Sequence, residues 1–433
     1  MKKTFMVIIC LFILLFGIDV YAKDSIYTLN KYSEEEYDFI LKNKNSFVVA
    51  GTFLKTTLTE DDNEYLDYQV MLVKYNKNNQ IKWKYNYGSN MSDSLYALNY
   101  HYDSELNIDG YVLVVDKTMD YQEHTTIKPM FIIIDDDGKN IGEVDTYLEE
   151  DSYVNNMIYT TNNEGIIDGY LLVGKCHDKS FIAKYDLSLN KIWNKDYTLD
   201  GVSTSIEEVE QVNDSYVMVL FDNNNNTYKI SKFDNNGDFV KIIKEDFEKD
   251  DVPHIMKNDN KYIIYGYTDE VKLNKKSATS YYLIQYNEND EVDWDLIGDV
   301  NVNKKKLIKL ISVYDKDTLI GFNLMYTNGN DNSIEVVKIN VDGTIGNKIK
   351  KIKNNYYKIN DFITKKDTIY FIGQIDCPDD DSCDYDSSCL FLVSDENKVI
   401  EVKDNDSKNI LVIGGLIIVV IYLVVFYVKK RRN

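Results

Sequence analysis

One short apolar element recurs along the whole chain. An aromatic residue, Thr or Ile is followed by β-branched residues, and the run often ends in Gly. The copies are FVVAG at 47, YVLVV at 111, YLLVG at 170, YVMVL at 216, YIIYG at 262, TLIGF at 318 and IYFIG at 369. Successive copies begin about 46 to 64 residues apart. That interval is typical of the blades of β-propellers and not of separate sandwich domains.

Each copy has the same kind of neighbours. A short segment such as SIEEVEQV precedes it, and a hairpin such as YKISKFDNNGDFV follows it. Apolar and β-branched runs bounded by Asn, Asp and Gly clusters are typical of strands joined by turns. Four strands per unit and seven units predict an all-β fold, a seven-bladed β-propeller, over residues 23–402.

Three of the hairpins share a Trp at a fixed distance from the turn. Trp83, Trp193 and Trp294 each lie seven residues after the Asp or Asn that opens the turn, whereas positions 142, 241 and 347 of the alternate units hold other residues. Asp or Asn at a turn can bond the backbone two residues on, which sets where the next strand begins. A Trp there can bury a large area, so we expect these three Trp to dock neighbouring blades.

The best copy of this pattern is Ala183, Asp186 and Trp193, a small residue, an Asp and then the Trp. It resembles the tryptophan-docking repeat of the quinoprotein-type (PQQ-like) propellers, most specifically in the first, third and fifth units. The resemblance implies the propeller fold for most of the chain. Quinone-dependent members usually have eight blades and adjacent cysteines beneath the cofactor. This chain has seven readable units and no Cys-Cys pair, so we expect no cofactor.

Both ends of the chain are apolar. Residues 1–22 begin with Lys2 and Lys3, continue with a short apolar run and end in VYA, which predicts a signal peptide cleaved after Ala22. Residues 410–428 are an unbroken apolar stretch of the length that a transmembrane helix needs, followed by the basic tail 429–433. We expect a single-pass protein of the cell membrane, with the propeller outside, a linker at 403–409 and a short cytoplasmic C-terminus.

The chain is strongly acidic, with a net charge of −22. Because both ends are basic, the part between them is more acidic still. Such a surface repels nucleic acid and anionic lipid, so we expect no nucleic-acid partner. A hydrophobic content of 44% and 36 Tyr exclude a disordered chain.

The loops differ between the two faces of the expected propeller. If the strand order follows that of the family, the loops between second and third strands and those between units share one face, the top face. These loops vary most, and variable loops on a rigid scaffold usually carry binding. Several are acidic, such as Glu60 to Asp67 and Glu149 to Asp151, and lysines lie opposite, at 304–306 and 348–353.

The most acidic top loop, CPDDDSCDYDSSC, also contains cysteines. Outside the cell a disulfide is expected, and Cys377 and Cys389 lie where they can face each other, with Cys383 or Cys176 left over. Four cysteines allow three full pairings, which stay open. Clustered carboxylates suit Ca²⁺, the one ion that we consider for this loop, although the spacing is not that of an EF-hand. The candidate ligands are Asp379, Asp380, Asp381, Asp384 and Asp386.

The chain contains no HExxH, GxSxG, GxGxxG or P-loop motif, and its four His are scattered. Cys176 and His177 are adjacent, but a nucleophile and its base must face each other in space. We therefore expect a binding or scaffold module that recognises an extracellular protein or glycan through the top face. The alternative is a polysaccharide lyase or hydrolase with a site in the central funnel. A structural partner of a membrane complex is a third hypothesis.

Overall fold

The computed structural model describes residues within 27–401. The gaps are 29–34, 44–45, 59–63, 79, 89–91, 104, 122–123, 200, 249–251, 269–279, 300–307, 316–317, 329–332, 354–356, 366–367, 376–386 and 394–398. The expected signal peptide, linker, transmembrane segment and tail lie outside the described residues. Among the residues that are described, no helix is long and apolar enough to cross a membrane.

The described strands form seven sheets, of which six have four strands in chain order. The six sheets are β2 (Glu35–Asn43), β3 (Ser46–Leu58), β4 (Glu64–Tyr75), β5 (Ile81–Tyr87); β6 (Leu95–Tyr102), β7 (Ile108–Tyr121), β8 (His124–Asp135), β9 (Asn140–Asp145); β10 (Ser152–Thr161), β11 (Ile167–Cys176), β12 (Lys179–Asp186), β13 (Lys191–Tyr197); β14 (Thr204–Val212), β15 (Ser215–Asp222), β16 (Thr227–Asp234), β17 (Phe239–Glu248); β18 (His254–Asn258), β19 (Lys261–Thr268), β20 (Ser280–Tyr286), β21 (Val292–Asp299); and β22 (Ile308–Asp315), β23 (Thr318–Asn328), β24 (Ser333–Ile339), β25 (Ile345–Lys353). The seventh sheet contains β26 (Tyr357–Lys365), β27 (Thr368–Ile375) and β28 (Ser387–Val393), with β1 (Tyr27–Thr28) and β29 (Val399–Glu401).

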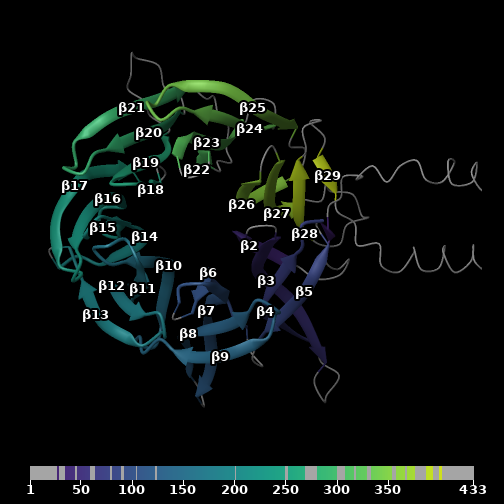
Figure 1. Ribbon diagram of the computed structural model, residues 1–433. Helices are drawn as coiled ribbons and strands as arrows, with labels where there is room; N and C mark the ends of the chain where they lie inside the picture. The colour runs from purple at the N-terminus through teal and green to yellow at the C-terminus, as the bar shows by residue number, and fades with distance from the viewer. Residues whose placement is uncertain are drawn as a thin grey trace, which may run out of the picture.

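The sheets follow one another around a common axis, with the first strand of each innermost and the fourth at the rim (Figure 1). Neighbouring strands are antiparallel, as the hairpin pattern predicts. The all-β class and the β-propeller architecture expected from the repeats are therefore confirmed.

The seventh sheet joins the two ends of the described chain. One edge of β28 pairs with β27, and the other pairs with both β1 and β29. The first sheet packs beside it, since the rings of Phe47 and Tyr370 have centroids 5.1 Å apart. The short strand β1 was not predicted from the sequence.

The aromatic residue that opens the repeated element forms the core between sheets. Phe47, Tyr111, Tyr170, Tyr216 and Tyr262 are all essentially inaccessible to solvent. In the sixth sheet the register shows that the element begins at 322 and not at 318. Phe322 pairs with the last residue of the third strand, Ile339, as Tyr262 pairs with Tyr286.

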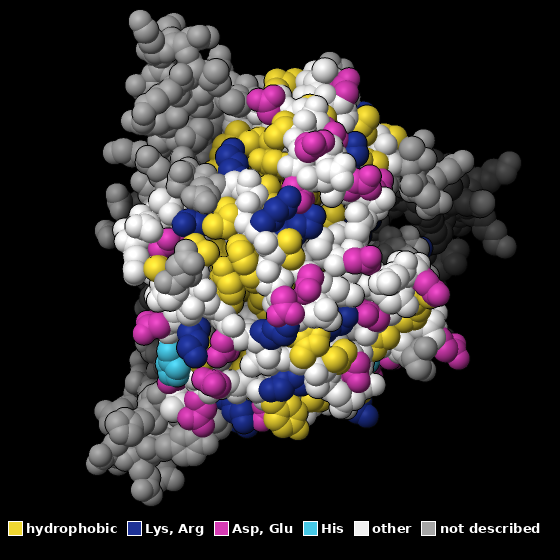
Figure 2. Space-filling model, turned by 90° about the vertical axis from the view of Figure 1, so that its left-hand side faces the viewer, with side chains coloured by type: hydrophobic (Ala, Val, Ile, Leu, Met, Phe, Trp, Pro, Cys, Tyr) yellow, Lys and Arg dark blue, Asp and Glu magenta, His cyan; other side chains and the backbone are white. Residues whose placement is uncertain are grey.

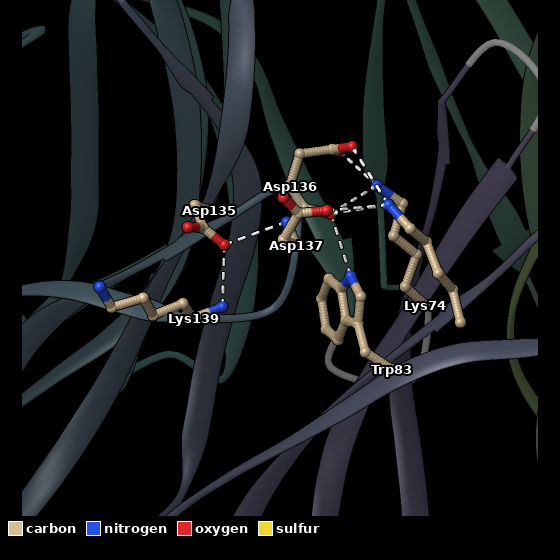
Figure 3. A network of polar contacts seen from close by, with 7 residues as sticks. Lys74, Trp83, Asp135, Asp136, Asp137 and Lys139 are labelled. Atoms are coloured by element: carbon tan, nitrogen blue, oxygen red, sulfur yellow. Dashed lines mark hydrogen bonds and ion pairs between the residues drawn. The ribbon is translucent and has the colours of Figure 1, made fainter.

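The Asp or Asn that opens a turn bonds the backbone two residues on, as the sequence predicted. The Asp135 carboxylate accepts hydrogen bonds from the backbone N–H groups of Asp137, at 3.0 Å, and Lys139, at 2.8 Å (Figure 3). Asn76, Asp234 and Asn287 accept the same pair of bonds in their own turns. The side chain that opens each of these turns therefore fixes the start of the outermost strand.

Each of the three Trp lies against a glycine in the turn of the next sheet. A Cβ on Gly138 would lie 2.5 Å from the Trp83 ring, one on Gly237 2.8 Å from Trp193, and one on Gly343 2.7 Å from Trp294. The Trp83 Nε1–H donates to the Asp136 carbonyl, at 3.0 Å, and the nearly buried Lys74 forms an ion pair with the Asp136 carboxylate (Figure 3).

The outermost strands form a mixed rim. Apolar side chains lie among lysines and carboxylates over β13, β17 and β21 (Figure 2). Ile192, Val240 and Val292 are more than half exposed there. Single exposed apolar residues among charges are ordinary for a soluble surface, so the rim itself indicates no function.

Candidate functional site

The longest described strands belong to two neighbouring hairpins, β3–β4 and β7–β8. The pairing of β3 with β4 continues beyond the end of β5 for six residue pairs, from Phe53–Gln69 to Leu58–Glu64. The pairing of β7 with β8 continues equally far, to Tyr121–His124. Six pairs of a β-ribbon extend about 17 Å. Both hairpins, purple and blue, run past the edge of the ring in Figure 1.

The connection from β5 to β6 ties the roots of the two hairpins together. The Asp93 N–H donates to the Tyr68 carbonyl of β4, at 2.7 Å. On the other side, the Thr118 hydroxyl donates to the Ser92 carbonyl, at 2.5 Å, and the Asp116 N–H donates to the Ser94 carbonyl, at 3.0 Å. Because this short segment bonds to β4 and to β7, the two ribbons leave the ring in a fixed relation.

Carboxylates are buried at these roots. Asp67, Asp93 and Asp116 are at most 4% exposed. Burial raises the pKa of Asp116 to about 6, against hydrogen bonds from Ser94, and the nearby Asp93 adds to the rise. The sequence predicted that Asp67 lies in an acidic loop of the top face, and this is wrong. Asp67 lies on β4, paired with Lys55, and it is buried.

A second set of polar side chains lies near the axis, on the innermost strands of the fourth to seventh sheets. Five innermost strands carry a β-bulge at the same place, with Asp38, Tyr96, Asn155, Glu207 and Asn360 as the extra residues. Glu208 and Asp361 directly follow their bulges. His254 of β18 and Lys309 of β22 occupy the same level, because each pairs with the fourth residue of its repeated element, Tyr265 and Met325.

These side chains connect one sheet to the next. The Glu208 carboxylate accepts from the Ile255 N–H, at 3.0 Å, and the Asp361 carboxylate accepts from the Ile40 N–H, at 3.2 Å. Each thus satisfies a backbone group on the free edge of the following innermost strand. Glu208 also contacts His254 Nδ1, and Asp361 contacts Lys309 Nζ. We call Glu208, His254, Lys309 and Asp361 the axial layer.

The axial layer contains opposite charges. Burial alone would raise the pKa of Glu208, but the charge and hydrogen bond of His254 outweigh it and lower that pKa. Burial would lower the pKa of His254, but Glu208 raises it. Each member of the pair therefore stabilises the charged form of the other, Glu208 as the carboxylate and His254 as the imidazolium. The side chains of Glu208, His254 and Lys309 remain 27%, 30% and 35% exposed.

Glu210 lies two residues beyond Glu208, on the same side of β14. The residues at its level in the third, fifth, sixth and seventh sheets are apolar: Ile158, Met256, Ile311 and Ile363. Burial raises the pKa of Glu210 to about 7, although Lys257 opposes the rise. A carboxyl group whose pKa is raised to near neutral pH is suited to general acid–base chemistry.

The residues expected to bind Ca²⁺ are not placed. Asp379, Asp380, Asp381, Asp384 and Asp386, together with Cys377 and Cys383, lie outside the described residues. Cys389 lies on β28, where its backbone pairs with that of Thr28. Cys176 is a buried free thiol whose S–H donates to Glu149, at 3.7 Å. Burial raises the pKa of this thiol, and Glu149 adds to the rise.

No protein-family model matches this chain, and no curated protein matches it. Its structure is similar to the β-propeller domain of the Trilobed protease from Pyrococcus furiosus, with 12% identity, 87% of this chain and 98% of that chain covered, and a TM-score of 0.46. It is also similar to the polysaccharide lyase Uly1, with 11% identity, 83% and 90% covered and a TM-score of 0.47. The WD40 domain of SCAP from fission yeast has 9% identity, 87% and 99% covered and a TM-score of 0.39. At these values, activity and ligand must be argued from this chain's own residues.

Proposed function

We propose that this chain is a cell-surface protein in which the seven sheets are the blades of one closed propeller, anchored by residues 410–428. Its function is to bind an extracellular protein through hairpins β3–β4 and β7–β8. The observation that carries the proposal is the six-pair extension of both ribbons from neighbouring sheets. An extension of this kind is not needed to pair the four strands of a sheet, whereas it offers a large surface to a partner.

A protein fits these ribbons better than a glycan does. The roots of the ribbons are bonded to the connections at 92–94 and 151, but no other described strand pairs with either ribbon nearer its tip. An added strand of a partner can pair with the edge of such a ribbon. The tie through 92–94 also holds the ribbons ready, which reduces the ordering cost of binding.

The expected anchor agrees with this role. The last described strand ends at Glu401, and the linker 403–409 spans at most about 25 Å when extended. The propeller is therefore held close to the bilayer, where it can recruit a partner from the cell surface or capture a membrane neighbour.

Site-specific photocross-linking in the native cell tests the proposal. A photoreactive phenylalanine replaces Tyr68, which is 44% exposed at the root of β4, and in a control chain it replaces Val240 on the rim. We expect a discrete adduct from position 68 and none from position 240. Replacing residues 57–65 and 119–126 by Asn-Gly turns should abolish that adduct, while replacing the tight turn 223–226 should not. Equal adducts from both probe positions would refute the proposal.

The axial layer favours a second function, cleavage of an extracellular polysaccharide near the axis. The specific observation is the group of charged side chains near the axis, the Glu208–His254 pair with Lys309. Glu210 lies two residues beyond Glu208, and its pKa is raised to about 7. If this is the function, the full chain cleaves a polysaccharide, Glu210→Gln abolishes the cleavage, and shortening the hairpins leaves it intact. Absence of cleavage across a panel of acidic and neutral polysaccharides would exclude it.

A further inference from the structure

Three side chains with metal-binding atoms meet where the second sheet passes to the third. Glu149 lies in the β9–β10 connection, Cys176 ends β11, and His177 begins the turn to β12. One carboxylate oxygen, the thiol sulfur and one imidazole nitrogen all lie within 4.8 Å of one another. Among the described residues, no other His, Cys, Asp and Glu side chains form such a group.

We propose that Glu149, Cys176 and His177 bind a divalent transition-metal ion, with Zn²⁺ preferred. Thiolate, imidazole and carboxylate are the ligand types that Zn²⁺ uses, and a soft sulfur ligand disfavours Ca²⁺ and Mg²⁺. With metal–ligand bonds of 2.0–2.3 Å, two ligands of a tetrahedral ion lie about 3.6 Å apart. The Cys176 sulfur and Glu149 Oε2 are already 3.7 Å apart.

The fold holds the backbone of each ligand. Ser152 pairs with Cys176 across β10 and β11, and its hydroxyl donates to the Glu149 carbonyl, at 2.7 Å. The Asp151 N–H donates to the Ile127 carbonyl of β8, at 2.8 Å, which fixes the same connection. His177 lies in a two-residue turn, since Cys176 pairs with Lys179. Only the exposed side chains of Glu149 and His177 must move to close on an ion.

Three protein ligands leave one tetrahedral position open. An open position of this kind takes water, or a ligand from another molecule. The site is separate from the axial layer and from the acidic loop considered for Ca²⁺. It lies at the root of β8, so a bound ion would link the base of hairpin β7–β8 to the third sheet.

A simpler arrangement uses the same atoms without a metal. The Cys176 S–H donates to Glu149 in the structure, and such a bond needs no ion. The two possibilities differ in their response to Glu149→Gln. The glutamine keeps an acceptor oxygen for the thiol but removes the charge, so metal affinity falls while the fold is retained.

Co²⁺ binding to the reduced, purified full-length chain in detergent tests the site. Co²⁺ takes the same ligands as Zn²⁺, and a thiolate ligand gives a charge-transfer band in the near ultraviolet. We expect this band to saturate at one equivalent of Co²⁺ and to disappear when Zn²⁺ is added. Cys176→Ser should abolish it, and His177→Gln and Glu149→Gln should each weaken affinity about tenfold or more.

Two further variants make the test specific. A chain with Cys377→Ser, Cys383→Ser and Cys389→Ser keeps only Cys176 in the mature sequence and should show the full band. Glu164→Gln alters an exposed carboxylate in the β10–β11 turn of the same sheet and should change nothing. Circular dichroism of every variant checks that the fold is intact. No band in the wild-type chain, a band that survives Cys176→Ser, or a band lost in the triple variant overturns the proposal.

Discussion

At the scale of single residues, the alternation of Trp has a steric cause. The three Trp occur in the first, third and fifth sheets, and each faces a turn glycine in the following sheet. The turn of the fifth sheet faces no Trp, and there Asp290 takes the corresponding left-handed position. Its carboxylate binds Lys232 and Lys241 of the fourth sheet, at 2.9 and 2.8 Å. The residue at the left-handed position of a turn is thus matched to the side chain of the preceding sheet that faces it, Gly to Trp and Asp290 to the two lysines.

Gly138→Ala tests this matching. Gly138 has φ +87° and no room for a Cβ beside Trp83, whereas Gly165 has φ +75° and nothing within 4 Å. Gly165→Ala should lower the free energy of unfolding by about 1 kcal/mol, because alanine is strained in this left-handed backbone conformation. Gly138→Ala should cost about 2 to 4 kcal/mol, because overpacking adds to it. Denaturant unfolding measures both, and equal losses would mean that the Trp83 contact contributes nothing.

Glu208 and Glu210, both on β14, should make the free energy of unfolding depend on pH in opposite directions. The pKa of Glu208 is lowered, so its contribution to stability is present above the unfolded value, about 4.3, and is lost as pH falls. The pKa of Glu210 is raised to about 7, so the folded state binds the extra proton and stability falls as pH rises from about 4.3 to 7.

Unfolding free energies at pH 5 and pH 8 therefore separate two isosteric variants. Glu210→Gln should be slightly more stable than the wild type at pH 5, and its advantage should be larger at pH 8, since the variant avoids burying a charge. Glu208→Gln should be less stable than the wild type at both values. A Glu210→Gln variant whose advantage does not grow with pH would show that the pKa of Glu210 is not raised in the folded state.

At the scale of elements, the sequence could predict those features of the fold that depend on residues within one hairpin. The strand pairs and turns were predictable because the aromatic element and the Asp or Asn of each turn act within one hairpin. The innermost bulges were not, since an extra residue such as Glu207 leaves no mark in a pattern of apolar and polar residues. Strand β1 has two residues, and its partner Leu390 lies at the other end of the chain.

The candidate sites were harder to predict for the same reason. The axial layer takes one residue from each of four sheets, and each residue is unremarkable in its own segment. Only SIEEVEQV carried a signal, because Glu208 and Glu210 fall on one side of a strand that should be buried. The adjacent Cys176 and His177 were visible, but Glu149 comes from the preceding connection, 27 residues away. Register between sheets, and not local pattern, brings these groups together.

At the scale of the whole molecule, the ring depends on contacts between its first and last sheets. Asp361 lies at that junction: it accepts from the Ile40 N–H of the first sheet and forms an ion pair with Lys309 of the sixth. One carboxylate on β26 therefore links three successive sheets. If the sheets form one closed unit, weakening this junction lowers the stability of all of them together.

Calorimetry of the full chain carrying Asp361→Ala tests closure. The alanine leaves the Ile40 N–H and the Lys309 ammonium without their partner, which should cost about 2 to 4 kcal/mol and lower Tm by several degrees in a single transition. Asp361→Asn keeps an acceptor for Ile40 and should lose less. Asp137→Ala is the matched control, because that side chain is 88% exposed in its ion pair with Lys82, and it should change stability by less than about 0.5 kcal/mol. Two separated transitions, or equal effects of Asp361→Ala and Asp137→Ala, would mean that the sheets do not unfold as one ring.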